Sequence, residues 1–479
     1  MTVSTTPQWL QKVNKKRRNR DEAIQRFFDA EDAASGTLHA NGPYNGTTDD
    51  ATSQETSFDS IADLVGTISA GTLTASELCT AYIKRLTEIL FEDALQQANE
   101  LDCFFKENGR LVGPLHGVPM TLKDQFDIQG YDSTLGYVGR AFKPAQRDCV
   151  LVALLRQMGA IIIAKSNLPQ SIMWCETENP LFGLTTHPKN TEFTPGGSTG
   201  GEGTLLALQG TVVGWGTDIG GSIRIPSHML GLYGLKPSRE YSMKWPENLP
   251  MQDMTLCRGN QERCIKSALL SWYVGHACVI IVFHSKIAQD QYYTADGGED
   301  IKRDVAAAGE PYIPHVEALV NKGKPISVYD YWQLNKQKLA AQKRYLDLWN
   351  STKSTTSGKP IDILLCPVMP HSAVPHRKCR WVGYTKVFNF VDYPSVVLPA
   401  GEVSMEVDGA AAADMAAYEP RNALDEWNWN LFDLDAMNGM PIGVQIVARR
   451  LQEEKALGAA KAVDDILKSA EIPQIKASS

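Results

Sequence analysis

Two loops rich in glycine and serine, PGGSTGGEG at residues 195–203 and GTDIGGSIR at residues 216–224, decide how this chain of 479 residues is interpreted. Their serines are Ser198 and Ser222. Glycines beside a serine let the backbone turn tightly and leave N–H groups uncovered, where they can point at an anion. Each loop alone is more typical of a turn or linker, and Ser222 could equally be a helix N-cap. The rest of the chain must therefore decide between these interpretations.

The composition is that of a globular protein without an unusual charge. Hydrophobic residues make up 43% of the chain and charged residues 21%, with a formal net charge of -8 and a pI of about 5.7. This balance favours solubility and argues against nucleic acid or an anionic membrane as the main partner. A nucleotide site is also disfavoured, because neither GxxxxGK[ST] nor GxGxxG after a strand occurs.

Cysteines and histidines are scattered along the chain. The nine cysteines include no CxxC pair, so we expect reduced thiols and a cytoplasmic protein rather than a disulfide framework. The nine histidines form neither HxH nor HxxxH, so no metal site is expected. We expect no other cofactor. One apolar stretch, residues 267–283, is short for a membrane span and is interrupted by Gly275 and His276. We expect a buried helix and strand there, and no stable membrane span.

Near residue 57 the character of the chain changes. Apolar positions recur at helical spacing close to the N-terminus and predict an amphipathic helix, broken by a basic run at residues 15–20. Residues 34–57 are rich in Gly, Thr, Ser, Asn and Asp, which is typical of a linker or an extended arm. We therefore predict a helical arm with a linker at residues 1–57 and one catalytic domain at residues 58–479.

Helical and strand patterns alternate within the second region. A capping box at residues 74–77 opens a helix that is expected to run to about residue 101. Other helices are expected at residues 149–158, 331–349 and 453–467, and strands at residues 118–122, 161–164, 212–215, 363–367, 394–398 and 440–448. This alternation predicts an α/β fold, with a large twisted mixed β-sheet flanked by α-helices.

Three motifs in a fixed order resemble the amidase signature family. They are GPLHGVPMTLKD at residues 113–124, the loop at residues 195–203, and the loop at residues 216–224 followed by GLKPS at residues 234–238. Within that family the chain is similar to the fungal acetamidase-type branch, which is related to fatty-acid-amide hydrolases. The resemblance covers roughly residues 58–468. It is specific because the order and the spacing of all three motifs agree.

A catalytic triad is what this resemblance implies. Ser222 would be the nucleophile, Lys123 the base, and Ser198 the bridging serine, which in the family follows a cis peptide bond. A serine hydroxyl is a poor nucleophile until a neighbour takes its proton. A lysine can do so only as a neutral amine, so burial must lower its pKa from the reference value of ~10.4. The apolar run before Lys123 fits such burial.

The resemblance also assigns the groups that hold the substrate. The oxyanion hole would consist of the backbone N–H groups of four consecutive residues, Ile219, Gly220, Gly221 and Ser222. Losing one such donor typically slows an enzyme by about 10²–10³-fold. Ile172 would line the acyl side of the pocket, Ser198 would contact the substrate, and Thr217 and Arg224 would brace the loop. His116 is interpreted as structural, because the family mechanism needs no histidine.

Two departures from the family pattern matter. Thr199 stands where relatives usually carry a second serine; a hydroxyl is kept, so little change is expected. The stretch at residues 239–275 is shortened by tens of residues, and that region normally supplies core structure and part of the substrate channel. A lost layer would leave apolar surface uncovered. The departure leaves all three triad positions in place.

The function that fits best is hydrolysis of a carboxamide to a carboxylic acid and an amine or ammonia. A small-molecule amide would be the substrate, and the protein could form a homodimer. Two alternatives stay open. The chain could be a catalytically impaired amidase-like binding protein, or an amidotransferase-type subunit that passes ammonia from glutamine to an acceptor.

Overall fold

The structure is a computed structural model that describes residues 6–35, 65–66, 68–70, 90–239, 290–354, 357–410 and 418–469. Four predictions lie wholly or largely outside these residues. They are the linker beyond residue 35, the capping box at residues 74–77, the shortened stretch from residue 240 onward, and the apolar stretch at residues 267–283.

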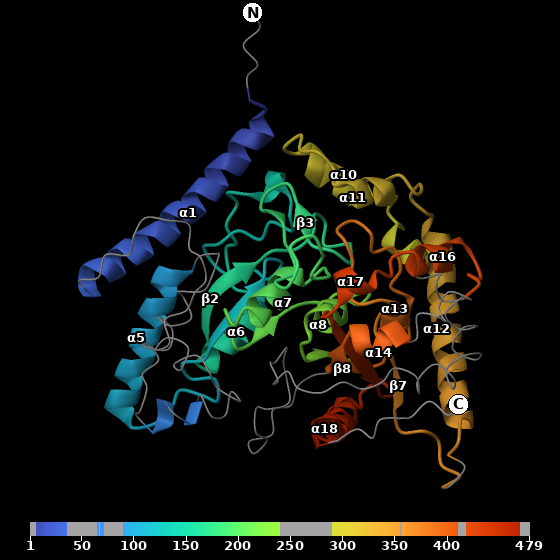
Figure 1. Cartoon of the computed structure of the whole chain (residues 1–479). Helices are drawn as coiled ribbons and strands as arrows, with labels where there is room; N and C mark the ends of the chain where they lie inside the picture. Colours follow the sequence, from blue (N-terminus) through green and yellow to red (C-terminus); the bar gives the residue numbers. More distant parts are fainter. Residues whose placement is uncertain are drawn as a thin grey trace, which may run out of the picture.

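A parallel sheet lies in the half of the molecule next to the N-terminal helix (Figure 1). It contains β1 (Pro119–Lys123), β2 (Ile161–Ser166) and β5 (Gly214–Trp215) in the order β2-β1-β5. Every residue of β1 and β2 is buried, as expected for parallel strands with both faces covered. The predicted strands at residues 118–122 and 161–164 are confirmed, and each extends to the polar residue at its carboxyl end.

An antiparallel sheet forms the second half. Its strands are β6 (Gly234–Lys236), β8 (Ser395–Glu402), β9 (Pro441–Val447) and β7 (Leu364–Pro367), in that order. The last helix, α18 (Glu453–Ser469), packs on β8 and β9 with an apolar stripe of alanine and leucine. The described part of the chain therefore contains one parallel and one antiparallel sheet, and their strands are not hydrogen-bonded to each other. A short hairpin, β3 (Glu178–Asn179) with β4 (Gly183–Leu184), stands apart.

The remaining helices surround the two sheets. The described ones are η1 (Val138–Arg140), α6 (Val150–Gln157), α10 (Glu299–Ala306), α11 (Pro314–Val320), α12 (Val328–Ser351), α13 (Gly383–Phe390), α14 (Met405–Ala410), α16 (Ala423–Trp429) and α17 (Leu434–Met437). The predicted helices at residues 149–158, 331–349 and 453–467 are confirmed. α12 lies on the side of the molecule opposite the N-terminal helix (Figure 1).

Two short helices join the sheets and place both glycine loops between them. α7 (Gly200–Ala207) begins directly after the first loop and packs on β1 and β5. α8 (Arg224–Leu230) begins at the end of the second loop and packs on β8 and β9. The two helices also contact each other. Because Lys123 is the last residue of β1, it lies at the carboxyl edge of the parallel sheet, where open α/β folds bind their ligands.

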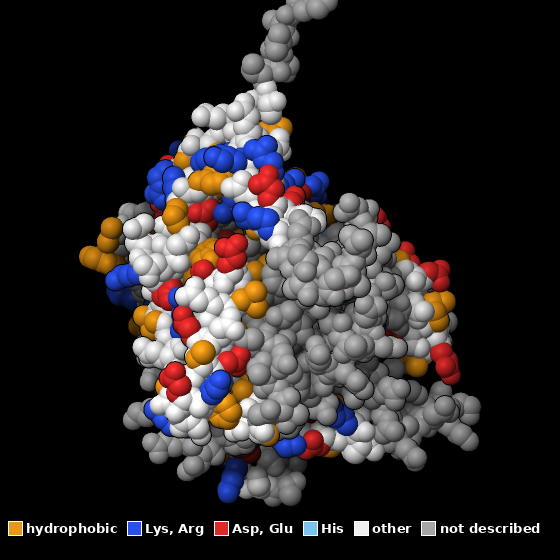
Figure 2. All heavy atoms as spheres, turned by 90° about the vertical axis from the view of Figure 1, so that its left-hand side faces the viewer, with side chains coloured by type: hydrophobic (Ala, Val, Ile, Leu, Met, Phe, Trp, Pro, Cys, Tyr) orange, Lys and Arg blue, Asp and Glu red, His pale blue; other side chains and the backbone are white. Residues whose placement is uncertain are grey.

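Two helices differ from the prediction. α1 (Gln8–Ser35) runs unbroken through the basic residues, because Lys and Arg are good helix formers whose charged ends can reach water. Figure 2 shows Lys and Arg side chains gathered over this helix. α5 (Phe91–Asn108) begins only at Phe91, since Leu90 has non-helical dihedrals, and it ends seven residues beyond the predicted 101. Its end is set by Gly109, whose φ of 62° suits a glycine.

Candidate active site

Lys123 reaches from the end of β1 into a nest of hydroxyl groups. Its side chain is fully buried, and Nζ lies 2.6 Å from Ser198 Oγ. The Oγ1 atoms of Thr199 and Thr217 each lie 3.1 Å from the same nitrogen. No carboxylate in the described part of the chain forms an ion pair with it. The amine is therefore surrounded by neutral oxygens rather than by a counter-ion.

Burial controls the protonation of this lysine. Loss of hydration lowers the pKa of Lys123 to about 7, although the Asp218 and Glu202 carboxylates oppose the shift. Burial also raises the pKa of Glu202 to about 7, and Thr121 Oγ1 donates to this carboxyl at 2.5 Å. A substantial fraction of the lysine is consequently uncharged at neutral pH.

The first glycine loop presents Ser198 to the lysine. The Gly197–Ser198 peptide bond is cis, as the family resemblance implied, and Ser198 is buried. Close packing explains the glycine, because a Cβ at Gly197 would lie 2.5 Å from the Glu176 carbonyl oxygen. The two loops are joined through the backbone, where the Thr199 N–H donates to the Ser222 carbonyl at 3.1 Å. Among the described contacts, no side-chain hydrogen bond links Ser198 to Ser222.

A buried ion pair shapes the second loop. Arg224 donates from Nη2 to Asp218 Oδ1 at 2.9 Å and from Nε to Oδ2 at 3.0 Å, and both side chains are almost completely buried. Arg224 also donates to Asn389 Oδ1 at 2.6 Å and to Gln445 Oε1 at 3.2 Å. Burial opposes ionisation of Asp218, but Arg224 holds the pKa of that carboxyl well below its usual range. The pair thus ties the loop to α13 and β9.

One predicted oxyanion donor is already occupied. The Gly221 N–H donates to Asp218 Oδ1 at 2.8 Å, so in this structure it already has a hydrogen-bond acceptor within its own loop. The N–H groups of Ile219, Gly220 and Ser222 donate to none of the residues that the structure describes. Ser222 is also not the helix N-cap, because that position belongs to Ile223, whose side chain makes no capping bond. Three donors of the predicted four stay available.

A cavity of about 700 Å³ opens beside Ser222. Four of the six predicted substrate-binding residues line it, namely Ile172, Ile219, Gly220 and Ser222, whereas Ser198 and Gly221 are not among its lining residues. Gly197 reaches the same wall, whereas Lys123 lies behind it. Ile172 has a φ of 57°, a rare conformation for a β-branched residue. Indoles give the cavity aromatic walls; Trp174, for example, stacks on the His315 ring at 4.6 Å between centroids.

Several supporting residues were missed or only partly foreseen from the sequence. Thr217 was expected to brace its loop, but the sequence did not indicate its partner. Thr217 Oγ1 donates to Gln125 Oε1 at 2.7 Å. Asn389 donates to the Asp218 carbonyl at 2.7 Å from a segment without any recognisable motif. Only proximity in the fold identifies such residues. His116 accepts the Val112 N–H through Nδ1 at 3.1 Å, a structural contact.

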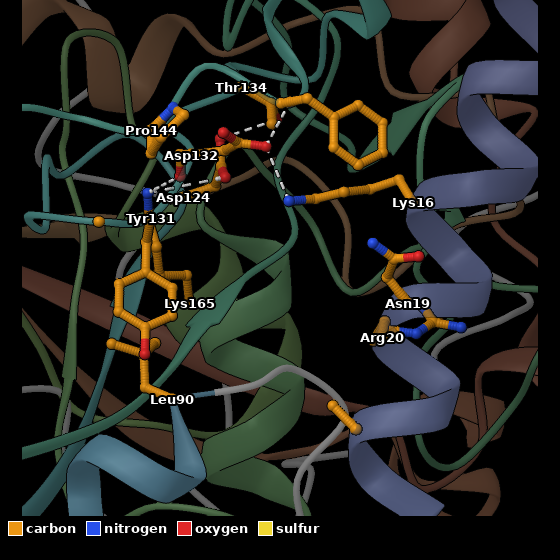
Figure 3. A pocket seen from close by; sticks show the side chains of 13 residues that line it. Lys16, Asn19, Arg20, Leu90, Asp124, Tyr131, Asp132, Thr134, Pro144 and Lys165 are labelled. Atoms are coloured by element: carbon orange, nitrogen blue, oxygen red, sulfur yellow. Dashed lines mark hydrogen bonds and ion pairs between the residues drawn. The ribbon is translucent and has the colours of Figure 1, made fainter.

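A second cavity, of about 490 Å³, lies between part of α1 and the body of the protein (Figure 3). Lys16 reaches across from α1 and forms an ion pair with Asp132 at 2.7 Å. On the same wall, Asp124 accepts a hydrogen bond from Thr134 Oγ1 at 3.0 Å. We assign the cavity no ligand.

Fold and cavity together define a class of protein, an α/β enzyme with a buried lysine–serine site. The sequence matches the protein family described as Amidase over residues 72–274 and 279–457. The chain therefore belongs to the amidase family and is an amide-hydrolysing enzyme. None of the helices in the described ranges has both the length and the apolar character needed to cross a bilayer.

Relatives support this assignment. The chain is 49% identical over 451 residues to Amidase 1 of Gibberella moniliformis, covering 80% of this chain and 86% of that protein. It is 31% identical over 492 residues to the acetamidase of Emericella nidulans, covering 85% and 89%. A solved fatty acid amide hydrolase aligns with a TM-score of 0.79 at 23% identity, covering 96% of this chain and 95% of that one. The last similarity concerns the fold alone, and it confirms the predicted amidase-signature architecture.

Proposed function

We propose that Ser222, Ser198 and Lys123 form a catalytic triad that cleaves a carboxamide through an acyl-enzyme on Ser222. The observation that supports it most is the hydrogen-bond arrangement around the lysine amine. Thr217 commits its hydroxyl proton to Gln125 and Thr199 commits its own to the Thr217 carbonyl at 3.3 Å. Both threonine oxygens can therefore only accept hydrogen bonds from Lys123.

This pattern orients the lone pair of the amine. A neutral lysine has two N–H bonds and one lone pair. If Thr199 and Thr217 receive the two N–H bonds, the lone pair is left for the third neighbour, Ser198 Oγ at 2.6 Å. That geometry is the one a base needs to draw a proton from Ser198. Its pKa of about 7 makes the neutral form available at neutral pH.

The proposed reaction begins when the Ser222 hydroxyl turns towards Ser198, a contact that tightens when substrate binds. Ser222 Oγ attacks the amide carbon and its proton passes to Ser198, whose own proton passes to Lys123. The oxyanion is held by the N–H groups of Ile219, Gly220 or Ser222. The proton then returns through Ser198 to the leaving nitrogen, and the C–N bond breaks. Water attacks the resulting ester by the same route and releases the acid.

A fluorophosphonate probe tests the nucleophile. We expect the purified protein to be labelled at Ser222, as located by mass spectrometry of the peptide, and we expect Ser222→Ala to abolish the label. Lys123→Ala should lower kcat/KM for a small aliphatic amide by at least about 10³-fold, because no other base replaces it. Circular dichroism checks that both variants stay folded.

Labelling and kinetic measurements on the same proteins distinguish the triad from the two alternative functions. A folded protein without any label would favour a catalytically impaired binding protein. Glutamine hydrolysis that outpaces small aliphatic amides would favour an amidotransferase-type subunit. If Lys123→Ala keeps near-normal kinetics, the lysine is not the base and the triad is wrong.

A further inference from the structure

Two cysteines meet in the wall of the cavity beside Ser222. The Sγ atoms of Cys175 and Cys379 are 2.9 Å apart, although 204 positions separate the two residues along the chain. Both thiols are buried, with exposed fractions of 7% for Cys175 and 0% for Cys379. An S–S bond measures about 2.05 Å, so the sulfurs need to approach by less than 1 Å to become bonded.

The backbone around the pair is fixed by hydrogen bonds. The Glu176 carboxylate accepts the Cys379 N–H at 2.8 Å and the Arg377 N–H at 2.6 Å, so the segments of both cysteines share one anchor. The Cys379 segment is also tied to a third part of the chain, because the Thr194 N–H donates to the Val374 carbonyl at 2.9 Å. The close approach of the sulfurs is therefore a property of two tethered segments rather than of one side-chain rotamer.

The location gives one of the thiols access to small molecules. Both cysteines belong to one apolar cluster, but only Cys175 lines the cavity that Ser222 and Ile172 also line. A small oxidant that enters the cavity meets Cys175 first. Cys379 is then the neighbour that can complete a disulfide.

We propose that Cys175 and Cys379 form a reversible redox site, which a small hydroperoxide oxidises to a disulfide in the cavity wall. The Cys175 thiolate attacks the peroxide and the O–O bond breaks, giving a sulfenic acid and, from hydrogen peroxide, one water. The Cys379 sulfur then attacks Cys175 Sγ, the S–S bond forms, and a second water leaves. Two electrons pass from the thiols to the peroxide, and a dithiol reductant reverses the change.

Burial affects the rate of this oxidation. It raises the pKa of the Cys175 thiol well above its ordinary value, with the neighbouring Cys379 and Glu176 adding to the shift. Because the thiolate is the reactive form, oxidation should be slow at neutral pH and should become faster as the pH rises. Cys103 provides an internal reference for a solvent-exposed thiol.

The consequence of the disulfide is a cross-link between distant parts of the chain. Closing so long a loop restricts the unfolded chain strongly, so the oxidised protein should resist unfolding better than the reduced one. The cross-link also fixes two segments of the cavity wall against each other. Hydrolysis of amides should therefore differ between the two redox states.

Peptide mapping without reduction tests the site. The full-length protein is treated with hydrogen peroxide, then with iodoacetamide, digested, and analysed by mass spectrometry. We expect a linked pair of peptides containing Cys175 and Cys379, its loss after treatment with dithiothreitol, and a higher Tm for the oxidised protein. Cys379→Ser should give no linked pair and no Tm change, whereas Cys103→Ser should behave as the parent protein.

Catalysis is compared within each protein as the ratio of kcat/KM before and after oxidation. The ratio should depart from unity in the parent and in Cys103→Ser, return to unity with dithiothreitol, and stay at unity in Cys379→Ser. The proposal is overturned if Cys175 and Cys379 stay as free thiols after prolonged treatment with hydrogen peroxide at alkaline pH, in which Cys103 is fully oxidised, or if Cys175 pairs with another cysteine. Because the mapping does not depend on the triad, its failure would leave the proposed mechanism untouched.

Discussion

Lys123 combines two properties that a lysine rarely has together: it is fully buried, and it contacts hydroxyl oxygens rather than carboxylates. Desolvation disfavours its charged form, and the hydroxyls compensate only in part. Burial is unfavourable for the charged lysine, and for that reason it leaves part of the amine neutral, and able to accept a proton, near neutral pH. The chemistry of this site therefore depends on where one proton resides.

The pH dependence of the reaction follows from that proton. Below its pKa of about 7, Lys123 is protonated and cannot accept the serine proton; above it, the neutral amine can. We expect kcat/KM for an uncharged amide to rise with pH through an apparent pKa of about 7, and then to level off. Stopped assays across the neutral range measure this profile. A profile that is flat through pH 7, with folded protein at both ends, would contradict the assignment of Lys123 as the base.

Thr199 tests the hydroxyl nest with a matched pair of substitutions. Thr199→Ser keeps the hydroxyl that contacts Lys123 Nζ, so activity should stay within about twofold of the parent. Thr199→Val keeps the shape but removes the hydrogen bond, which is worth ~1 kcal/mol, so kcat/KM should fall about five- to tenfold. Steady-state kinetics on both variants gives the comparison. Equal activities would show that this hydroxyl does not orient the amine.

At the scale of elements, the second glycine loop depends on α8. Arg224, the first residue of α8, neutralises Asp218, and Asp218 in turn accepts the N–H groups of Gly221 and Ile223. One buried carboxylate thus holds the turn that exposes the remaining N–H groups to the cavity. The loop is shaped by this network rather than by glycine alone.

Breaking this network should affect both stability and activity. Arg224→Met leaves a buried, unpaired carboxylate, so we expect the free energy of unfolding to fall by about 3–5 kcal/mol in urea denaturation. Adding Asp218→Asn to Arg224→Met should restore part of that stability, because the buried charge is removed. The double variant should remain poorly active, since its loop has lost the carboxylate that orders it. Additive losses of stability would argue against a coupled pair.

How much of the fold could be predicted from the sequence depends on how far apart in the chain the interacting residues lie. β1 and β2 are runs of apolar residues with polar ends, and such local patterns were sufficient to predict them. The start of α5 at Phe91 was not predicted, because Leu90 continues the apolar spacing and only its non-helical dihedrals place it outside the helix. The contact between Thr217 and Gln125 joins segments 92 positions apart, which no local pattern reveals.

Within the site the same limit applies. Lys123, Ser198 and Ser222 could be proposed because three motifs preserve their order and spacing. The sequence could not show that Asp218 would occupy the Gly221 N–H, because that depends on how the turn folds. Nor could it bring Cys175 to Cys379, whose meeting requires the segments held by Glu176 to lie side by side.

At the scale of the whole molecule, the first part of α1 packs on the body of the protein. Val13 is 1% exposed and packs with Val138, Ala141 and Leu181. Arg17 donates to the Leu181 carbonyl at 2.7 Å. The two partners in each of these contacts are more than a hundred positions apart in the sequence. They bear on the prediction that residues 1–57 form an arm separate from the catalytic domain, because a separate arm could be weakened without weakening the enzyme.

Substitution of Val13 distinguishes an independent arm from an integral helix. If α1 belongs to the cooperative unit, Val13→Ala removes two buried methyl groups and should lower the free energy of unfolding by about 1–3 kcal/mol. Asn14→Ala, at the exposed neighbouring position, should change it by less than about 0.5 kcal/mol. Urea denaturation followed by tryptophan fluorescence and by amide hydrolysis measures both variants. If both probes report the parent midpoint for Val13→Ala, α1 docks without contributing to the fold, and the arm is a separate unit. A common shift of both probes would instead extend the catalytic domain to include α1, since the helix would then unfold together with the site that it borders.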